Sequence, residues 1–349
     1  MNKIPLVSIC LPNLNNRRYL PERFNSIFNQ TFQDWELIIL DSYSDDGSWE
    51  YIKDFTDSEP RAKCFQVTRG MYPTWNKCIK LALGKYVYIA TSDDNMALDC
   101  LEKMVAALEE HPECDLAHCL LRTFDENGVD QGDSWIKESL FAKSSSELLH
   151  RKHIRAAPHD GLLHLNGYFS VYISITEILI RKSLFEKIGY FQTEFGSIAD
   201  YGWNMRASLV GSTIHVPDTW AGWRRHAAQS TAQVNPWSEE HQQKIRLMMD
   251  YAIEICRPHL PKRVVCGLES GWSHYFQQKS KFDEGMSIRK NSFQRLCFIA
   301  TQLLLGSKIA LEYIKWRFSR KNDWNRSESE VVREWLTSIG FDIPLKVLD

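Results

Sequence analysis

Short apolar runs alternate with amphipathic segments through the first 122 residues of the chain. The runs typical of strands are LVSICL (6–11), WELIIL (35–40), AKCFQVT (62–68), YVYIA (86–90) and DLAHCLL (115–121). Between them, apolar residues recur at helical spacing in 20–28, 48–55, 74–83 and 98–110, and Gly84 is expected to cap the third of these helices. This alternation predicts an α/β fold with a mostly parallel sheet between helices.

The pattern is looser after residue 122. Residues 123–170 contain turn residues, Trp135 and several histidines. A strand and a short helix are predicted over 175–191, a helix that begins at Asp200, and a strand over 212–218. From Ser238 onward the spacing is helical. We therefore predict an α/β domain over residues 1–235, with halves 1–122 and 123–235, and a helical C-terminal region over 236–349.

Polar and acidic residues follow three of the predicted strands, in PNLNN (12–16), DSYSDD (41–46) and TSDDN (91–95). Ligands of open parallel sheets bind beyond the carboxyl ends of the strands, so these segments are expected to form one site. Asp93 and Asp94 are adjacent carboxylates at the end of a buried strand, where like charges repel. They suit a hard divalent cation such as Mg²⁺ or Mn²⁺.

Composition and charge exclude some functions. The formal net charge is −2, which gives no indication of nucleic-acid binding. Nine cysteines form no CxxC motif, so reduced thiols and a cytoplasmic location are expected, and no signal peptide is recognised. Neither GxGxxG nor GxxxxGK[ST] occurs, which argues against dehydrogenases and P-loop enzymes and favours phosphate binding through a metal ion.

Taken in order, these motifs resemble family 2 glycosyltransferases. The segments that carry the resemblance are VSICLPNLNN, NQTFQDWELIILDSYSDDGS, RGMYPTWNKCIKLALGKYVYIATSDDN, ITEILIRKSLFEKIGYF and IADYGWNMRASLVGSTIHVPDTWAGWRRHAAQST, within residues 5–232. The resemblance implies a GT-A fold, which is a Rossmann-like sheet that binds a nucleotide-sugar through a divalent metal ion. The C-terminal residues beyond 232 are not covered.

The resemblance also assigns roles to individual residues. It places Asp41 on the uracil N–H, Asp94 on the metal ion, and Asp93 on the ribose or the metal ion. Asp200 corresponds to the catalytic base. The other residues expected to bind the nucleotide-sugar are Pro12, Asn13, Arg69, Asn76, Lys77, Ser92, Arg224 and Arg225, and His226 is expected to complete the metal shell.

The chemistry of transfer requires residues of these types. A divalent cation neutralises the leaving diphosphate as a Lewis acid, and a carboxylate takes the proton of the attacking acceptor hydroxyl. Structural alternatives exist for most of them. Asp93 and Asp94 could cap the helix at Leu98, Asp200 could complement a helix dipole, and Asp41 could form a turn. Lys77 could be a solvent-exposed lysine on a helix, and residues 224–226 could form a basic surface turn, without a role in binding.

Two positions depart from the family pattern. Thr91 stands where an acid usually precedes Asp93 by two positions, and Ala199 stands where the family usually has glutamate before the base. These departures support an alternative, a non-catalytic protein that binds nucleotide or glycan on the same fold. A nucleotidyltransferase is a further alternative, but it requires a glycine-rich loop after the first strand, and PNLNNRR contains no glycine.

The resemblance therefore implies an inverting, metal-dependent glycosyltransferase of the hexosyltransferase type. Its donor is expected to be a UDP-sugar, and its acceptor a glycan or lipid-linked sugar in polysaccharide biosynthesis. The stretch LLLGSKIALEYIKWRFSRK (303–321) mixes apolar and basic residues. It is interpreted either as a peripheral anchor at the inner face of a membrane or as a helix packed on the catalytic domain.

Overall fold

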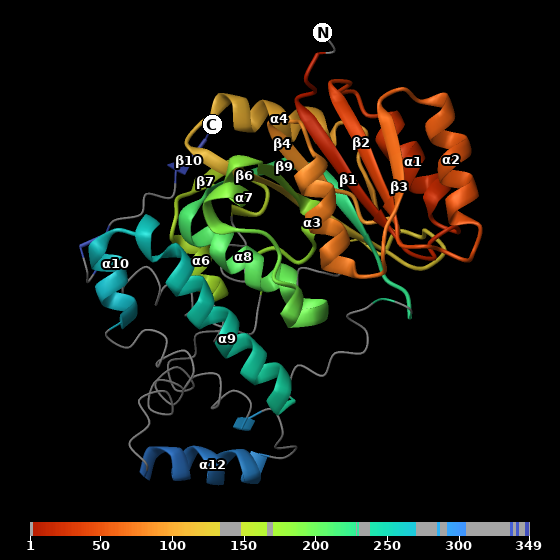
Figure 1. The fold of residues 1–349 in the computed structure, drawn as a ribbon. Helices are drawn as coiled ribbons and strands as arrows, with labels where there is room; N and C mark the ends of the chain where they lie inside the picture. Colours follow the sequence, from red (N-terminus) through yellow and green to blue (C-terminus); the bar gives the residue numbers. More distant parts are fainter. Residues whose placement is uncertain are drawn as a thin grey trace.

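The fold is built on one central sheet, seen in a computed structural model (Figure 1). The structure describes residues 3–132, 148–165, 170–227, 229, 238–269, 285–286, 292–304, 336–337, 340–341 and 346–348. The strand order is β3-β2-β1-β4-β8-β6-β9-β7-β10, and β5 pairs with β9 outside this path. Helices cover both faces, with α3 in front of the sheet in Figure 1 and α1 behind it.

The strands and helices predicted between residues 6 and 218 are present in the predicted order, and β5, β7, α6 and β10 are additional. The strands are β1 Val7–Asn13, β2 Trp35–Asp41, β3 Ala62–Gln66, β4 Tyr86–Ile89, β5 Asn95–Met96, β6 Cys114–Phe124, β7 His153–Arg155, β8 Ile178–Arg181, β9 Ser212–Arg224 and β10 Lys346–Val347. The α-helices are α1 Leu20–Phe28, α2 Ser48–Ser58, α3 Met71–Leu81, α4 Cys100–Glu110, α6 His159–His164, α7 Ser183–Ile188, α8 Ala199–Val210, α9 Glu239–Cys256, α10 Lys262–Gly267 and α12 Ser292–Leu304. Short 3₁₀ helices are η3 Ile175–Glu177, η4 Thr193–Ile198 and η6 Arg257–His259.

The predicted parallel sheet is present in the first half of the chain. β1 pairs in parallel with β2 on one side and β4 on the other, and β2 pairs in parallel with β3. Every residue of β2 and β4 is buried, as expected for strands covered on both faces. Asn13 lies opposite Asp41 in this register, so the polar segments after β1, β2 and β4 come together at one edge.

Beyond β4 the sheet is mixed. β8 is inserted between β4 and β6 and runs antiparallel to both, whereas β6 and β9 are parallel. β7 and β10 extend the far edge in antiparallel pairings. The sequence predicted strands at β6, β8 and β9 but not their partners, because apolar periodicity does not specify which strands pair. It did not predict β7 or β10.

The C-terminal end of β9 holds the TSDDN segment in position, because β5, which begins at Asn95, pairs with it. β9 continues six residues past the predicted end at 218 to Arg224, and its pairing with β6 shifts register between Cys119 and Leu120. Asn95 of β5 then lies opposite Gly222. A Cβ atom at position 222 would lie 1.8 Å from Oδ1 of Asn95, so only glycine allows this close approach.

Gly84 does not cap α3, contrary to the sequence prediction. The helix ends at Leu81, and Ala82 is extended, with φ −61° and ψ 131°. A Cβ atom at Gly84 would lie 2.7 Å from the backbone nitrogen of Ser8 and 2.9 Å from the carbonyl carbon of Val7. Glycine is therefore required because the chain passes directly against β1 before β4 begins.

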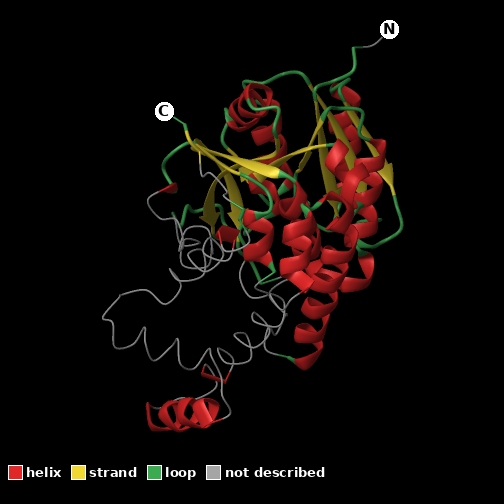
Figure 2. Ribbon diagram, turned by 90° about the vertical axis from the view of Figure 1, so that its left-hand side faces the viewer, coloured by secondary structure: helices red, strands yellow, loops and turns green. Residues whose placement is uncertain are grey.

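The first helix after residue 236 packs on the α/β domain. α9 contacts α8, and a Cβ atom at Gly202 of α8 would lie 3.2 Å from the Met248 side chain. Figure 2 shows α9 extending away from the sheet, with α12 further out. The division at residue 235 stays a prediction. Most of the proposed membrane stretch 303–321 lies outside the described residues.

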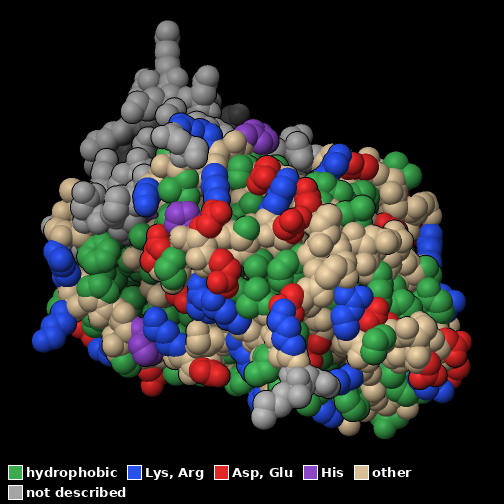
Figure 3. Space-filling view, turned by 90° about the horizontal axis from the view of Figure 1, so that it is seen from above, with side chains coloured by type: hydrophobic (Ala, Val, Ile, Leu, Met, Phe, Trp, Pro, Cys, Tyr) green, Lys and Arg blue, Asp and Glu red, His purple; other side chains and the backbone are tan. Residues whose placement is uncertain are grey.

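Two surface properties bear on partners. Within the described ranges, no helix is both long and apolar enough to cross a membrane. On the face shown in Figure 3, acidic and basic side chains are interspersed rather than gathered into a patch of one sign, in keeping with the formal net charge of −2.

Candidate active site

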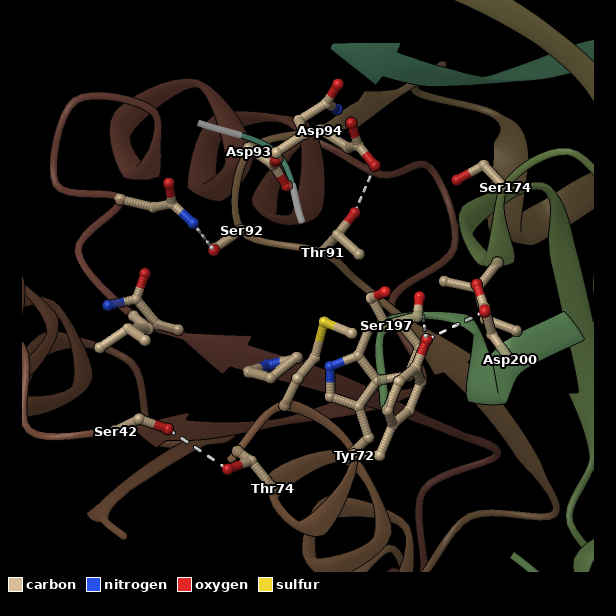
Figure 4. A pocket seen from close by; sticks show the side chains of 18 of the residues that line it. Ser42, Tyr72, Thr74, Thr91, Ser92, Asp93, Asp94, Ser174, Ser197 and Asp200 are labelled. Carbon is tan, nitrogen blue, oxygen red and sulfur yellow. Dashed lines mark hydrogen bonds between the residues drawn. The ribbon is translucent and has the colours of Figure 1, made fainter. Parts of the chain in front are cut away.

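A cavity of about 550 Å³ lies beyond the carboxyl ends of β1, β2 and β4, which is the size of a small-molecule site. Its walls come from the segments after these strands, the start of α3, η3, the start of α8 and the residues after β9. Of the residues predicted from the sequence, those that line it are Pro12, Asn13, Ser92, Asp93, Asp94, Asp200 and His226. Figure 4 shows most of these side chains around the cavity.

Asp93 and His226 form a pair in the cavity wall. Nε2 of His226 lies 3.0 Å from Oδ2 of Asp93, and the imidazole ring lies against Tyr19, with 5.2 Å between ring centroids. The side chain of Asp93 is 19% exposed. A carboxylate and an imidazole that face the same cavity at this distance are suited to share a divalent cation.

Asp94 has a different environment, although it is adjacent in sequence. Its Oδ1 accepts a 2.8 Å hydrogen bond from the backbone N–H of Arg224, and its Oδ2 accepts one from the hydroxyl of Thr91. The residue is 4% exposed. Burial, and then the charge of Asp93, raise the pKa of Asp94 to about 7. Asp94 therefore joins the end of β4 to the end of β9, and Thr91 supplies a hydroxyl donor to it.

Asp200 enters the cavity from the first turn of α8. Its Oδ1 accepts hydrogen bonds from the hydroxyl of Tyr72 and from the backbone N–H of Tyr201, both at 2.9 Å. Among the described residues, Oδ2 has no hydrogen-bond partner. Burial raises the pKa of Asp200, and the hydrogen bond from Tyr72 opposes that shift. One carboxylate oxygen is thus held in place while the other is available to a substrate.

Asp41 lies behind the cavity wall. It is fully buried and accepts hydrogen bonds from Nδ2 of Asn13 at 2.8 Å and from the backbone and hydroxyl of Ser44 at 2.9 and 2.6 Å. Oδ1 of Asn13 is buried and has no partner in the described part of the chain. Asn13, which does line the cavity, is therefore oriented by Asp41 and presents the unpaired acceptor.

Arg224, which the sequence suggested as a diphosphate contact, is not among the residues that line the cavity. Its side chain is only 2% exposed, and the guanidinium donates to the carbonyls of Asp93 and Asp125 and to the carboxylate of Glu22, at 2.7, 3.1 and 2.5 Å. It also lies over the ring of Tyr19. A buried guanidinium bonded in this way fixes the turn that carries Asp93 and has no group directed to the cavity.

Four other predicted nucleotide contacts are not among the residues that line the cavity: Arg69, Asn76, Lys77 and Arg225. Arg69 is exposed and pairs with Asp45 at 3.4 Å. Lys77 is exposed on α3, which agrees with the solvated alternative. The guanidinium of Arg225 stacks on Trp223, 4.5 Å from the ring centroid.

Asn76 joins α3 to the segment after α7. Its Nδ2 donates to the carbonyl of Phe191 at 2.8 Å, and its Oδ1 accepts from the N–H of the same residue at 3.0 Å. Asn76→Ala is expected to lower the free energy of unfolding by about 1–3 kcal/mol, because two buried backbone groups lose their partner. Denaturant unfolding would measure this, with Lys77→Ala as an exposed control on the same helix. Weaker UDP binding by Asn76→Ala at unchanged stability would instead support the nucleotide contact.

Sequence reasoning missed much of the cavity wall. The additional lining residues include Met71, Tyr72, Trp75, Ser174, Ser197 and Trp223. Tyr72 and Trp75 lie in TWNKCIKLAL or just before it, in a helix that was assigned only by its apolar spacing. The close spacing of Tyr72, Trp75 and Met71 at the start of a helix after Gly70 was the available signal, because a helix that follows a strand in such sheets begins at the ligand edge.

The chain is similar in sequence to known glycosyltransferases. A model described as glycosyl transferase family 2 matches residues 8–189, more than half of the chain. The putative glycosyltransferase EpsE of Bacillus subtilis is 33% identical over 132 residues, which cover 37% of this chain and 48% of that protein. A PGL/p-HBAD biosynthesis glycosyltransferase of Mycobacterium bovis is 26% identical over 219 residues, which cover 61% of this chain and 75% of that protein.

Solved structures show the same fold. The crystal structure of S. aureus TarS 1-349 in complex with UDP-GlcNAc has a TM-score of 0.56 at 20% identity, covering 84% of this chain and 79% of that one. The chain spans about half the length of the first curated relatives that it matches. The GT-A fold predicted from the sequence is confirmed, and the chain belongs to glycosyl transferase family 2.

Proposed function

We propose that this protein is an inverting, metal-dependent glycosyltransferase that moves a hexose from a UDP-sugar to a hydroxyl group of a glycan or lipid-linked acceptor. The observation that carries the proposal is the pair of acidic centres in one cavity. Asp93 faces it beside His226, and Asp200 faces it with an unpaired Oδ2. Asp93 and His226 are suited to bind a cation, and Asp200 is suited to accept a proton.

The charges around the cavity support metal dependence. Its described lining residues include no lysine or arginine, whereas Asp93, Asp94 and Asp200 are all acidic. A nucleoside diphosphate would meet negative charge there unless a cation accompanied it. The described residues contain no cluster of three or more His, Cys, Asp or Glu side chains that could hold a metal ion alone. This suits Mg²⁺ or Mn²⁺, which commonly combine one or two protein ligands with substrate phosphates.

In this proposal, Asp93 and His226 would hold the metal ion, and Asp94 would support the segment that carries Asp93 through its hydrogen bonds with Arg224 and Thr91. The ion, when bound, would neutralise charge that develops on the leaving diphosphate. Oδ2 of Asp200 accepts the proton of the acceptor hydroxyl while that oxygen forms a bond to the anomeric carbon. The bond from this carbon to the diphosphate oxygen breaks in the same displacement, so the configuration inverts. The raised pKa of Asp200 makes it a stronger base.

The choice of uridine rests on Asn13 and on one comparison. The buried Oδ1 of Asn13 lacks a partner in the described structure and could accept the imino N–H of uracil, with Pro12 beside it. Structures of TarS 1-349 contain UDP and UDP-GlcNAc. We therefore transfer to Asn13 the base contact that the sequence had assigned to Asp41, and give Asp41 the task of orienting Asn13.

The acceptor class is proposed from relatives. The putative glycosyltransferase TuaG of Bacillus subtilis, 32% identical over 108 residues, is named for teichuronic acid biosynthesis. The name of this relative and that of the PGL/p-HBAD biosynthesis glycosyltransferase support a role in polysaccharide or glycoconjugate synthesis. We assign catalysis to residues 1–235 and place the protein in the cytoplasm, with the C-terminal region 236–349 as the part that could reach a membrane-bound acceptor.

Calorimetric titration of UDP, GDP and dTDP into the protein tests the proposal. With Mn²⁺ present, UDP is expected to bind, and excess EDTA is expected to abolish the heat of binding because the diphosphate then meets uncompensated carboxylates. If GDP or dTDP binds more tightly than UDP, the proposed mechanism stands but the donor is not a UDP-sugar. Absence of nucleotide binding under every condition would contradict the proposal and favour a protein that binds only glycan.

A further inference from the structure

The hydroxyl of Tyr72 lies between two acceptors at the edge of the cavity. It is 2.9 Å from Oδ1 of Asp200 and 3.2 Å from the carbonyl oxygen of Ser197, as Figure 4 shows. A phenol has one proton to donate, and the shorter contact is to the charged acceptor. Burial raises the pKa of Tyr72 well above its usual range, so the hydroxyl remains a donor at every pH at which the protein would work.

The ring of Tyr72 is fixed by aromatic packing. Its centroid lies 5.0 Å from that of Trp75 and 5.6 Å from that of Phe191. Phe191 packs in turn on Trp203 of α8, at 5.3 Å, and its backbone is held by Asn76. A rigid cluster therefore joins α3, from the nucleotide-binding half, to α8, which carries Asp200.

We infer that Tyr72 is a positioning residue for Asp200: it fixes which carboxylate oxygen faces the substrate and stabilises the ionised form of the base. The geometry supports both parts. Oδ1 takes the Tyr72 and Tyr201 hydrogen bonds, so Oδ2 alone remains for the acceptor hydroxyl. Because Tyr72 itself lines the cavity, the donor pocket and the base share one rigid support. The inference rests on the proposed function only in naming Asp200 the base.

The groups that act on the charge of Asp200 are few. From α3 there is the Tyr72 hydroxyl, and from α8 the backbone N–H groups of Tyr201 and of Asp200 itself. η4 contributes the Ser197 carbonyl, which is bonded to Tyr72. From α6, the ring of His164 lies against Tyr201 rather than Asp200. Burial raises the pKa of Asp200 and these hydrogen bonds lower it, so removal of the Tyr72 hydroxyl raises it further.

The test is the carboxyl pKa of Asp200 in the Tyr72→Phe variant. Protein labelled with ¹³C at the aspartate carboxyl carbon would be titrated by NMR, and the Asp200 signal identified by its absence in Asp200→Asn. Phenylalanine keeps the ring contacts with Trp75 and Phe191. Loss of a hydrogen bond to a charged group is expected to raise the pKa of Asp200 by about one to two pH units. This measurement needs neither donor nor acceptor.

Tyr86→Phe is the matched control. The Tyr86 hydroxyl donates to a carboxylate, Glu109, at 2.6 Å, at the opposite end of the sheet from the cavity. The Tyr86→Phe variant should leave the pKa of Asp200 unchanged. An unchanged pKa of Asp200 in Tyr72→Phe, or an equal shift in Tyr86→Phe, would overturn the inference.

The second readout is the release of UDP from UDP-GlcNAc with water as acceptor, measured against pH. In Tyr72→Phe the acidic limb of the rate profile should move to higher pH and the rate at neutral pH fall by about tenfold to a hundredfold, while UDP affinity stays within about twofold. A fall in UDP affinity that accounts for the whole loss would overturn the positioning role. If Asp200→Asn keeps the wild-type rate, the base assignment fails, independently of the NMR result.

Discussion

Asp200→Asn is expected to lower the rate of sugar transfer by about 10²- to 10⁴-fold, the usual contribution of a general base, while leaving nucleotide affinity unchanged. Asparagine has the same shape and can still accept the hydrogen bonds of Tyr72 and Tyr201 at Oδ1. Its amide nitrogen replaces Oδ2 and cannot take a proton. Formation of UDP and glycoside, measured separately from UDP binding by calorimetry, would show transfer lost at constant affinity.

The change in the free energy of unfolding in Asp200→Asn distinguishes a loss of catalysis from misfolding. The pKa of Asp200 is raised in the folded state, so the folded protein binds this proton more tightly than the unfolded chain does. Its contribution to stability therefore falls as pH rises through the raised pKa. Removal of the charge in Asp200→Asn is expected to increase the free energy of unfolding at neutral pH, as is common when an active-site charge is removed.

Asp115→Asn is the matched control for Asp200→Asn. Burial also raises the pKa of Asp115, but this residue lies near the start of β6 and does not line the cavity. The Asp115→Asn variant should transfer sugar at the wild-type rate. A wild-type rate in Asp200→Asn would refute the base assignment. Retention of the anomeric configuration in the product, determined by NMR, would refute a single displacement.

The positions of the acidic segments could be predicted from the sequence because they depend on local patterns. The buried strands that end at Asn13, Asp41 and Ile89 are visible as apolar runs, and parallel pairing brings their ends to one edge. The helix that starts beside Asp200 is visible in the same way. Family resemblance then supplied the chemistry of these positions, which spacing alone does not contain.

The orientation of side chains within those segments could not be predicted. Asp93 and Asp94 have the same chemistry in sequence and both line the cavity, but Asp93 pairs there with His226, whereas Asp94 accepts hydrogen bonds from the N–H of Arg224 and the hydroxyl of Thr91. Arg224 appears as a surface cation in the sequence because nothing local shows that Glu22, 202 positions earlier, will pair with it. Such contacts depend on the mixed half of the sheet, whose pairing the sequence left open.

The second large effect is expected at the proposed metal site, where substitutions of the adjacent residues Asp93 and Asp94 should weaken Mn²⁺-dependent UDP binding to different extents. Asp93→Asn should weaken Mn²⁺-dependent UDP binding by at least about a hundredfold, because it removes a charged ligand facing the cavity. His226→Ala should weaken it as well. Electron paramagnetic resonance of free Mn²⁺ in the presence of UDP measures this affinity directly, without an acceptor and without turnover.

Asp94→Asn is the decisive comparison. Both Asp94 oxygens are already bonded, to Arg224 and Thr91, and its pKa of about 7 means that it is often uncharged at neutral pH. Asparagine should therefore replace it with a loss of Mn²⁺ affinity of less than about tenfold, since it keeps an acceptor for the Arg224 N–H. If instead Asp94→Asn abolishes metal-dependent binding and Asp93→Asn does not, then Asp94 is the metal ligand, as the family resemblance alone had implied. That result would also mean that Asp94 binds the ion through lone pairs that Thr91 and Arg224 do not engage, because each carboxylate oxygen accepts only one of these hydrogen bonds and has a second lone pair.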